Sequence, residues 1–294
     1  MTQLAGPTRS SNLRVLSTTV VVLLGLLAGE ASGNVQKTGS MSVTRWGHTA
    51  MFVGTGRVLV AGGYGPSGHL ATAELLDPLT GLFSSTGSMP EARTGHTATL
   101  LRTGKVLVAG GQTNVISAQC TSSATIYDST TGGWTGTGSM GTARRDFTLT
   151  VLPTGLVVAA GGDNGSAVST AERYNISNGG WGGAGDLGAG RSGHAAALFP
   201  DARILVVGGL NAGGGFSSIV EYDPVGNSWS AVETGTPRYS HAATLLPDGR
   251  MLVVGGLADG TTRLATAEFV KRKPATVLGV SLVVATPTGQ YSSE

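Results

Sequence analysis

The chain has 294 residues, of which 48 are glycine, while charged residues make up 12% and aromatic residues 5%. So much glycine argues against a helical bundle, because glycine is among the poorest helix formers, and its occurrence without a strict period of three excludes collagen. An apolar fraction of 40% argues against disorder, and the near balance of 19 basic and 17 acidic residues argues against a nucleic-acid-binding protein. The composition therefore predicts a turn-rich all-β protein.

Residues 1–33 have the features of a secretory signal peptide. Arg9 and Arg14 precede an apolar run at 15–28, which is shorter than the ~20 residues that a membrane span needs. Small residues at 31–33 offer a cleavage site. We therefore expect the mature chain to begin near residue 34, to be secreted or periplasmic in a bacterium, and to have no stable membrane insertion. A buried first strand or an uncleaved anchor is the alternative.

A repeat of about 48 residues covers the mature chain, with copies that start near residues 42, 90, 141, 188 and 235. Each copy opens with an arginine, usually followed by x-Gly-His, and the steps between these arginines are 48, 51, 47 and 47 residues. A pair of glycines follows each arginine at a constant register. These pairs lie at 62–63, 110–111, 161–162, 208–209 and 255–256.

Each copy predicts four short strands. The second copy begins with alternating small and larger residues at 96–101, and a glycine-bearing turn leads to the apolar run 106–109, which indicates burial on both faces. The glycine pair ends that strand, where unusual dihedrals or close backbone approach are needed. The fourth strand carries an aromatic residue that we expect to pack between repeats rather than to stack on sugars. These aromatic residues are Phe83, Trp134, Trp181 and Trp229.

The paired glycines, a downstream tyrosine and a tryptophan make residues 35–271 resemble the kelch-repeat family. The resemblance implies that each repeat folds into one blade of a β-propeller. A lone four-stranded sheet leaves two apolar faces exposed, and stacking such sheets in a ring covers both. We therefore predict an all-β propeller of about five four-stranded blades over 34–271, with 272–294 as an unassigned tail.

The two ends of the repeat region suggest how the ring closes. The fifth copy predicts three strands and then continues into the basic segment 271–274. Residues 35–41 match the fourth-strand ends at 83–89 and 134–140. We predict that this N-terminal strand completes the last blade. A truncated longer propeller, or one completed by a second chain, is the alternative, and the oligomeric state is left open.

The repeated arginines are the candidate ligand-binding residues. They precede the innermost strand of every blade, so we expect them to ring one mouth of the central channel, where guanidinium groups suit carboxylate, sulfate or phosphate. In the architectural alternative each arginine pairs with a glutamate on the third strand of its own repeat. Thr125 and Val220 replace that glutamate in copies two and four. The arginines are Arg45, Arg93, Arg144, Arg191 and Arg238, and the glutamates are Glu74, Glu172 and Glu268.

Histidines recur at one position in four copies, with Phe147 in the third. Imidazole is a common metal ligand, but equivalent residues of separate blades radiate from an axis, whereas zinc needs its ligands within ~2 Å of one point. We therefore predict hydrogen bonds to backbone at strand entrances, no metal and no cofactor. The histidines are His48, His96, His194 and His241.

An enzymatic alternative comes from the secreted radical-copper oxidases, whose propellers the stretch 245–250 resembles. That resemblance implies adjacent Tyr-His ligands and a tyrosine cross-linked to cysteine. Here Ser240 precedes His241, and the single cysteine, Cys120, lies in a loop of the second repeat. No G-x-S-x-G, H-E-x-x-H or phosphate-loop motif is present. We predict no catalytic residues.

The loops after the glycine pairs vary while the framework repeats, and binding residues concentrate on such loops. We therefore predict a non-catalytic binding module whose ligand is a protein or a surface glycan. An oxidase- or hydrolase-like enzyme that uses the channel mouth, and a structural surface repeat protein, are the alternatives. The variable loops are 64–73, 112–123, 163–170, 210–218 and 257–264.

Overall fold

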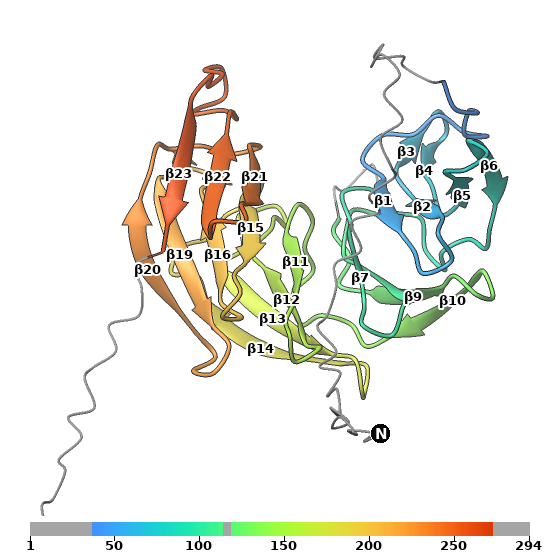
Figure 1. Ribbon diagram of the computed structural model, residues 1–294, viewed down its shortest axis with the longest axis horizontal. Helices are drawn as coiled ribbons and strands as arrows, with labels where there is room; N and C mark the ends of the chain where they lie inside the picture. Colours follow the sequence, from blue (N-terminus) through green and yellow to red (C-terminus); the bar gives the residue numbers. More distant parts are fainter. Residues whose placement is uncertain (1–36, 114–118, 273–294) are drawn as a thin grey trace, which may run out of the picture. The chain divides into compact units, whose positions relative to one another are not determined.

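The computed structural model describes residues 37–113 and 119–272, which form strands, bridges and turns without a helix (Figure 1). No helix among these residues is long and apolar enough to span a membrane. The strands form five antiparallel sheets that succeed one another along the chain, as blades 1 to 5. The prediction of a five-bladed all-β propeller is confirmed.

The strands of each blade pair in chain order. Blade 1 consists of β1 (Thr49–Phe52), β2 (Val58–Ala61), β5 (Ala73–Asp77) and β6 (Leu82–Ser85). Blade 2 consists of β7 (Thr97–Leu100), β8 (Val106–Ala109), β9 (Ala124–Asp128) and β10 (Gly133–Thr137). Blade 3 consists of β11 (Thr148–Val151), β12 (Val157–Ala160), β13 (Thr170–Asn175) and β14 (Gly180–Asp186).

Blade 4 consists of β15 (Ala195–Leu198), β16 (Ile204–Val207), β19 (Ser218–Asp223) and β20 (Ser228–Thr234). Blade 5 has three strands among the described residues, β21 (Ala242–Leu245), β22 (Arg250–Val254) and β23 (Ala267–Lys271). Two small hairpins lie in the variable loops: β3 (Tyr64–Gly65) with β4 (Gly68–His69), and β17 (Leu210–Asn211) with β18 (Gly214–Gly215).

The core lies between the blades. Consecutive first strands contact one another, from β1 to β7, β11, β15 and β21. The second strands β8, β12 and β16 are buried along their whole length, as their unbroken apolar runs predict. One apolar cluster joins Leu59 of blade 1 to Val108 of blade 2. Burial of these two-sided sheets therefore depends on the neighbouring blades.

The glycine pairs allow that close packing. Gly110 and Gly111 have φ angles of +65° and +98°, and the Gly111 N–H donates to the Arg144 carbonyl of the next blade at 2.9 Å. A Cβ on Gly110 would lie 2.3 Å from that carbonyl oxygen. Glycine is therefore needed both for the left-handed backbone and for the approach of the next blade.

The tryptophans of the fourth strands join neighbouring blades, as predicted. Each indole Nε1 donates to a carbonyl in the fourth-strand region of the preceding blade, at 2.7 to 2.9 Å. Each ring also packs on the tyrosine of its own third strand, with centroids 4.9 to 5.1 Å apart. The pairs are Trp134 with Tyr127, Trp181 with Tyr174, and Trp229 with Tyr222.

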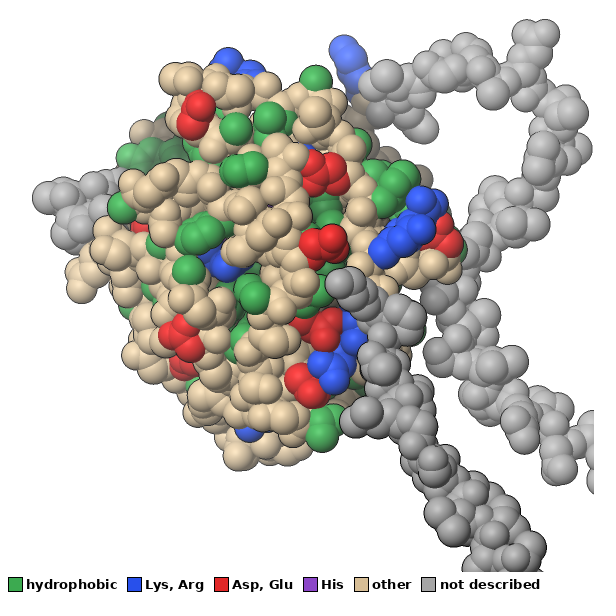
Figure 2. All heavy atoms as spheres, turned by 90° about the vertical axis from the view of Figure 1, so that its left-hand side faces the viewer, with side chains coloured by type: hydrophobic (Ala, Val, Ile, Leu, Met, Phe, Trp, Pro, Cys, Tyr) green, Lys and Arg blue, Asp and Glu red, His purple; other side chains and the backbone are tan. Residues whose placement is uncertain are grey.

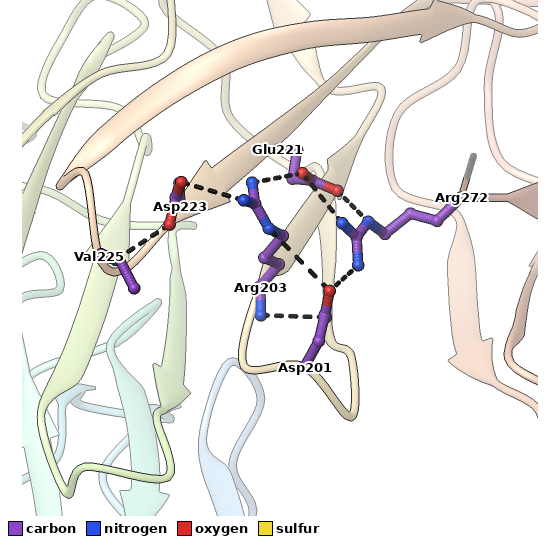
Figure 3. A network of polar contacts seen from close by, with 6 residues as sticks. All are labelled: Asp201, Arg203, Glu221, Asp223, Val225 and Arg272. Atoms are coloured by element: carbon purple, nitrogen blue, oxygen red, sulfur yellow. Dashed lines mark hydrogen bonds and ion pairs between the residues drawn. The ribbon is translucent and has the colours of Figure 1, made fainter. Parts of the chain in front are cut away.

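An ion-pair network ties the end of blade 5 to blade 4 (Figure 3). Arg272, which follows β23, contacts Asp201 in the turn before β16 and Glu221 on β19. Arg203 pairs with the same Glu221 at 2.9 Å and with Asp223 at 3.0 Å. Two guanidinium groups therefore share the buried Glu221 carboxylate at the junction of blades 4 and 5.

The closure predicted for the N-terminal strand is not seen among the described residues. The Gly39 N–H donates to the Gly81 carbonyl of blade 1 at 2.7 Å, just as Gly87 donates to Gly132 at 3.2 Å. Gly39 therefore contacts the turn of blade 1 in the same way as the residue after one blade's fourth strand contacts the turn of the next blade. Residues 35 and 36 lie outside the described residues, so their pairing with β23 stays a prediction.

Candidate functional site

The five repeated arginines lie buried inside the blades, which favours the architectural alternative, while a ligand-binding ring at the channel mouth stays a prediction. Each is at most 9% exposed, and its Nη1 donates to the first glycine carbonyl of its own blade at 2.7 to 3.0 Å. The same Nη1 reaches a carbonyl just before or at the start of the third strand, at 2.8 to 3.3 Å. Because Nη1 donates to both carbonyls, each arginine joins the glycine turn of its blade to the third strand. They are Arg45, Arg93, Arg144, Arg191 and Arg238.

The acidic partners follow the architectural alternative. Glu74, Glu172 and Glu268 pair with the arginines of blades 1, 3 and 5 at 2.9, 2.7 and 3.1 Å. Arg93 was expected to lack such a partner, but Glu91 supplies it at 3.0 Å. Arg191 forms no ion pair within the described residues.

Polar and aromatic contacts replace the missing carboxylate of blade 4. Arg191 donates to the Ser218 hydroxyl at 2.9 Å and lies 4.8 Å from the centroid of the Phe216 ring. Burial lowers the pKa of Arg191 to about 10. The group stays charged at neutral pH, although it is desolvated.

The histidines form hydrogen bonds across blade junctions. Nε2 of His96 lies 3.0 Å from Oγ1 of Thr49, and Nε2 of His194 lies 3.1 Å from Oγ1 of Thr148, so each imidazole has a threonine hydroxyl of the preceding blade as a partner. Burial lowers the pKa of both imidazoles to about 3, with a further contribution from the neighbouring arginine. Within the described residues, no three His, Cys, Asp or Glu side chains gather where they could hold a metal ion.

A backbone ladder on the loop face presents side chains that differ from blade to blade. The residue after each arginine pairs with the residue after each glycine pair, through two backbone hydrogen bonds of 2.8 to 3.1 Å. The backbone is thus constant while its side chains change from aromatic to polar to charged. We call these five pairs the mouth ladder: Trp46 with Tyr64, Thr94 with Gln112, Arg145 with Asp163, Ser192 with Leu210, and Tyr239 with Leu257.

Blade 1 contributes an exposed aromatic group to the ladder. Trp46 is 66% exposed, and its ring lies 5.4 Å from that of Tyr64, against which His69 packs edge-on at 5.2 Å. Burial lowers the pKa of His69, which favours its neutral form. Trp46 and Tyr64 line a surface hollow of about 440 Å³ together with Pro66.

Blade 3 contributes a charged group and departs from the Arg-x-Gly-His pattern. Arg145 donates to Oε1 of Gln112 at 2.7 Å and to Oδ1 of Asp163 at 3.0 Å, so it joins blades 2 and 3. The Cys120 thiol lies beside it, 3.3 Å from the Asp163 carbonyl. Asp146 has a φ of +53° where three other blades have glycine, and burial raises the pKa of its carboxyl. The equivalent residues of the other blades, Gly47, Gly95, Gly193 and Ser240, have φ angles of +51° to +63°, so blade 3 keeps the backbone of the repeat and differs only in residue type.

A second hollow of about 450 Å³ lies between the loops of blades 3 and 4 and is lined by Asp163, Ala167, Ser192 and Leu210 among others. Both hollows are therefore bordered by the mouth ladder. The side that carries β20 and β23 shows acidic, basic and apolar side chains interspersed, without a single field of one sign (Figure 2).

Sequence reasoning missed the aromatic pair of the ladder. Trp46 occupies the variable position of Arg-x-Gly-His, where the five copies have Trp, Thr, Arg, Ser and Tyr. Variation inside an otherwise repeated motif is the signal that could have found it, because a residue needed for packing would recur in every blade.

Comparison with known families agrees with this geometry. The family model of the KLHDC2/KLHL20/DRC7 Kelch-repeats domain matches residues 47–256, more than two-thirds of the chain. No curated protein matches the chain. The matched span contains all five glycine pairs and four of the five repeated arginines. The chain therefore belongs to the kelch-repeat family of β-propeller proteins.

Proposed function

We propose that this kelch propeller is a non-catalytic module that binds a protein partner through the mouth ladder. Kelch propellers are commonly protein-interaction modules. The observation that carries the proposal is that one constant backbone ladder presents different side chains in each blade. A rigid frame with variable side chains is the arrangement that recognition surfaces use, because ordering a preformed surface costs little entropy.

The chemistry of the ladder favours a protein ligand. Tryptophan, tyrosine and arginine are enriched among residues that dominate binding energy at protein interfaces, and the ladder contains Trp46, Tyr64, Arg145 and Tyr239. The exposed indole of Trp46 is the strongest candidate anchor, because it is large and lies beside a hollow.

A selection from a random 12-residue peptide library tests this proposal. Peptides selected on the immobilised chain should bind at the loop face, and Trp46→Ala should weaken them by at least about tenfold, the loss typical of an anchor residue. Leu79→Ser is the matched control, because Leu79 is 95% exposed in the turn between β5 and β6, away from the ladder. Peptides that bind the Trp46→Ala chain as tightly as the original would refute the proposal.

A glycan is the second candidate ligand, because an exposed indole such as that of Trp46 also offers a flat face to a sugar ring. Neutral oligosaccharides would then raise the melting temperature of the chain in a saturable way. The rise would disappear in Trp46→Ala and persist in Leu79→Ser.

We also propose that residues 1–33 direct export from a bacterial cell. The support is the basic flank at Arg9 and Arg14, the apolar run at 15–28 and the small residues at 31–33. Sequencing the N-terminus of the expressed protein tests this, with Asn34 expected as the first residue. A protein that begins at Met1 would contradict cleavage.

A further inference from the structure

A row of backbone hydrogen bonds joins the blades at the inner edge of the loop face. The residue two places after each repeated arginine has a left-handed φ of +51° to +63° and lies two residues before the first strand of its blade. From blade 2 to blade 5, its N–H donates to the carbonyl of the equivalent residue in the preceding blade, at 2.8 to 3.2 Å. Because consecutive first strands contact one another, these residues lie at the mouth of the channel that the strands line. We call them the inner rim: Gly47, Gly95, Asp146, Gly193 and Ser240.

Only blade 3 places a charge on the inner rim. Three of its five residues are glycine and one is Ser240, so the Asp146 carboxylate is the single charged side chain of the set. This side chain lies over the glycine of the preceding blade, since a Cβ on Gly95 would be 3.3 Å from Oδ1 of Asp146. It is 55% exposed, so a group that approaches the channel mouth can reach the carboxylate.

The backbone of the repeat does not need this carboxylate. Glycine adopts the same left-handed conformation in three blades, without the strain that a residue with a Cβ has there. Among the described residues, the one ion-pair partner of Asp146 is Arg145, whose Nε lies 3.7 Å from Oδ2 and is thus too far away for a hydrogen bond. A residue in a strained conformation that stabilising contacts do not explain is a candidate functional residue.

The charges around Asp146 do not balance. Arg145 donates to Oδ1 of Asp163 through Nε at 3.2 Å and through Nη2 at 3.0 Å, and its Nη1 donates to Gln112 at 2.7 Å. Desolvation by the surrounding protein raises the pKa of Asp146 most, and the charged groups that affect this pKa are Arg145, which lowers it, and Asp163, which raises it. Two carboxylates therefore lie beside one guanidinium group, which leaves one negative charge without a partner.

We propose that Asp146 selects partner segments that place a lysine or arginine side chain at the inner rim. The inference rests on the function proposed for the loop face and names the chemistry of its partner. A basic side chain compensates the unbalanced charge, and Gly95 and Gly193 in the neighbouring blades have no side chain that would block its long apolar stem. Because no three metal-ligating side chains gather here among the described residues, an organic cation fits the site better than a metal ion. Trp46 supplies the anchor, and the charged contact adds specificity.

Selection from the random 12-residue peptide library on the full chain and on Asp146→Asn tests this inference. Peptides selected on the original chain should carry lysine or arginine at one aligned position more often than the library does, and peptides selected on Asp146→Asn should not. Asparagine keeps the shape of the side chain and tolerates the left-handed backbone, so only the charge is lost. Asp128→Asn is the matched control, because it removes the same charge from the end of β9, where blade 3 has Asn175 at the end of β13.

A double-mutant cycle with one selected peptide shows whether the contact is direct. Replacing the basic residue of the peptide by methionine should weaken binding to the original chain about threefold to fivefold, in the upper part of the range for an exposed ion pair. The same replacement should change binding to Asp146→Asn by less than about twofold, because the partner charge is already absent. Asp128→Asn should behave like the original chain. Fluorescence anisotropy of the labelled peptides measures these affinities.

The outcomes separate this inference from the function on which it rests. Peptides that need Trp46 but carry no basic residue, or that bind Asp146→Asn as tightly as the original chain, would overturn the inference and leave the loop-face function intact. Peptides whose binding depends on Asp146 but not on Trp46 would support the inference and contradict the anchor. A chain that selects no peptide would overturn both.

Melting curves distinguish a binding role of Asp146 from a structural one. Asp146→Gly should melt no lower than the original chain, because glycine is unstrained at a φ of +53°. Its affinity for the selected basic peptide should nevertheless fall as in Asp146→Asn. A clearly lower melting temperature in both variants would show that the carboxylate stabilises the frame and would overturn the proposal.

Discussion

At the scale of single residues, the repeated arginines show how the same chemistry serves architecture. A guanidinium group has five donors in a rigid fork, which suits an anionic ligand but equally suits a set of carbonyls. In each blade the guanidinium group donates to carbonyls of the glycine turn and of the third strand. Arg45, Arg93, Arg144 and Arg238 also form an ion pair with a carboxylate. The arginine thus compensates buried carbonyls that would otherwise lack partners.

Replacing Arg144 should therefore destabilise the fold strongly. Arg144→Met leaves the Glu172 carboxylate, which is 8% exposed, without its cation, and removing one partner of a buried pair costs about 3–5 kcal/mol. Urea denaturation measures the change. Arg57→Met is the control, because Arg57 is exposed and its loss should change stability by less than about 0.5 kcal/mol. Equal stabilities for the two variants would contradict the architectural role.

At the scale of elements, the blade junction is the unit that repeats. The second strand, the glycine pair and the first strand of the next blade meet closely, and a tryptophan joins the outer strands. This explains why the glycines keep their register while the loops between them vary. It also explains why a blade has little stability alone, since each sheet has two apolar faces.

Two glycines at equivalent positions allow the contribution of the blade junction to stability to be measured. Gly110 and Gly255 both have a φ of +65°, so alanine costs about 1–2 kcal/mol at either for the left-handed conformation. At Gly110 the added methyl also meets the Arg144 carbonyl at 2.3 Å, so we expect a loss above about 3 kcal/mol there. Thermal or urea unfolding of the two variants compares them. An equal loss at Gly255 would show that another blade packs on it in solution.

At the scale of the whole molecule, the buried histidines make the unfolding free energy of the propeller depend on pH. The pKa of His96 and His194 is about 3 in the folded chain, below the 6.5 of an unperturbed imidazole, so folding favours their neutral forms. Their contribution to stability is complete above pH 6.5 and is lost as the pH falls from 6.5 towards 3. At pH 5 the loss is about 2 kcal/mol for each histidine.

The pH dependence can be removed without losing the packing. Phe147 occupies the histidine position in blade 3, so His96→Phe and His194→Phe should fit the same space. Between pH 6.5 and 5, where carboxylates remain ionised, the double variant should lose less unfolding free energy than the original chain. Urea denaturation at several pH values checks this. Parallel curves would mean that these imidazoles do not titrate on unfolding.

The sequence by itself determined the five blades, the strand positions, the glycine turns and the packing of the tryptophans. All of these follow from patterns within one repeat, because strand alternation and left-handed glycines are local properties of the chain. The Arg–Glu pairs of blades 1, 3 and 5 could also be predicted from the sequence, because both partners recur at fixed positions in the repeat.

Only the tertiary structure decided how the donors of the arginines are used, that Glu91 replaces the missing partner of Arg93, and that Trp46 stands exposed on Tyr64. It also placed Glu233 and Gly235 of blade 4 and Val270 of blade 5 around one hollow. These features depend on contacts between distant residues and on which faces neighbouring blades cover. Residue type and spacing do not specify how far a blade is buried. The faces of the same strands are buried or exposed according to what packs against them.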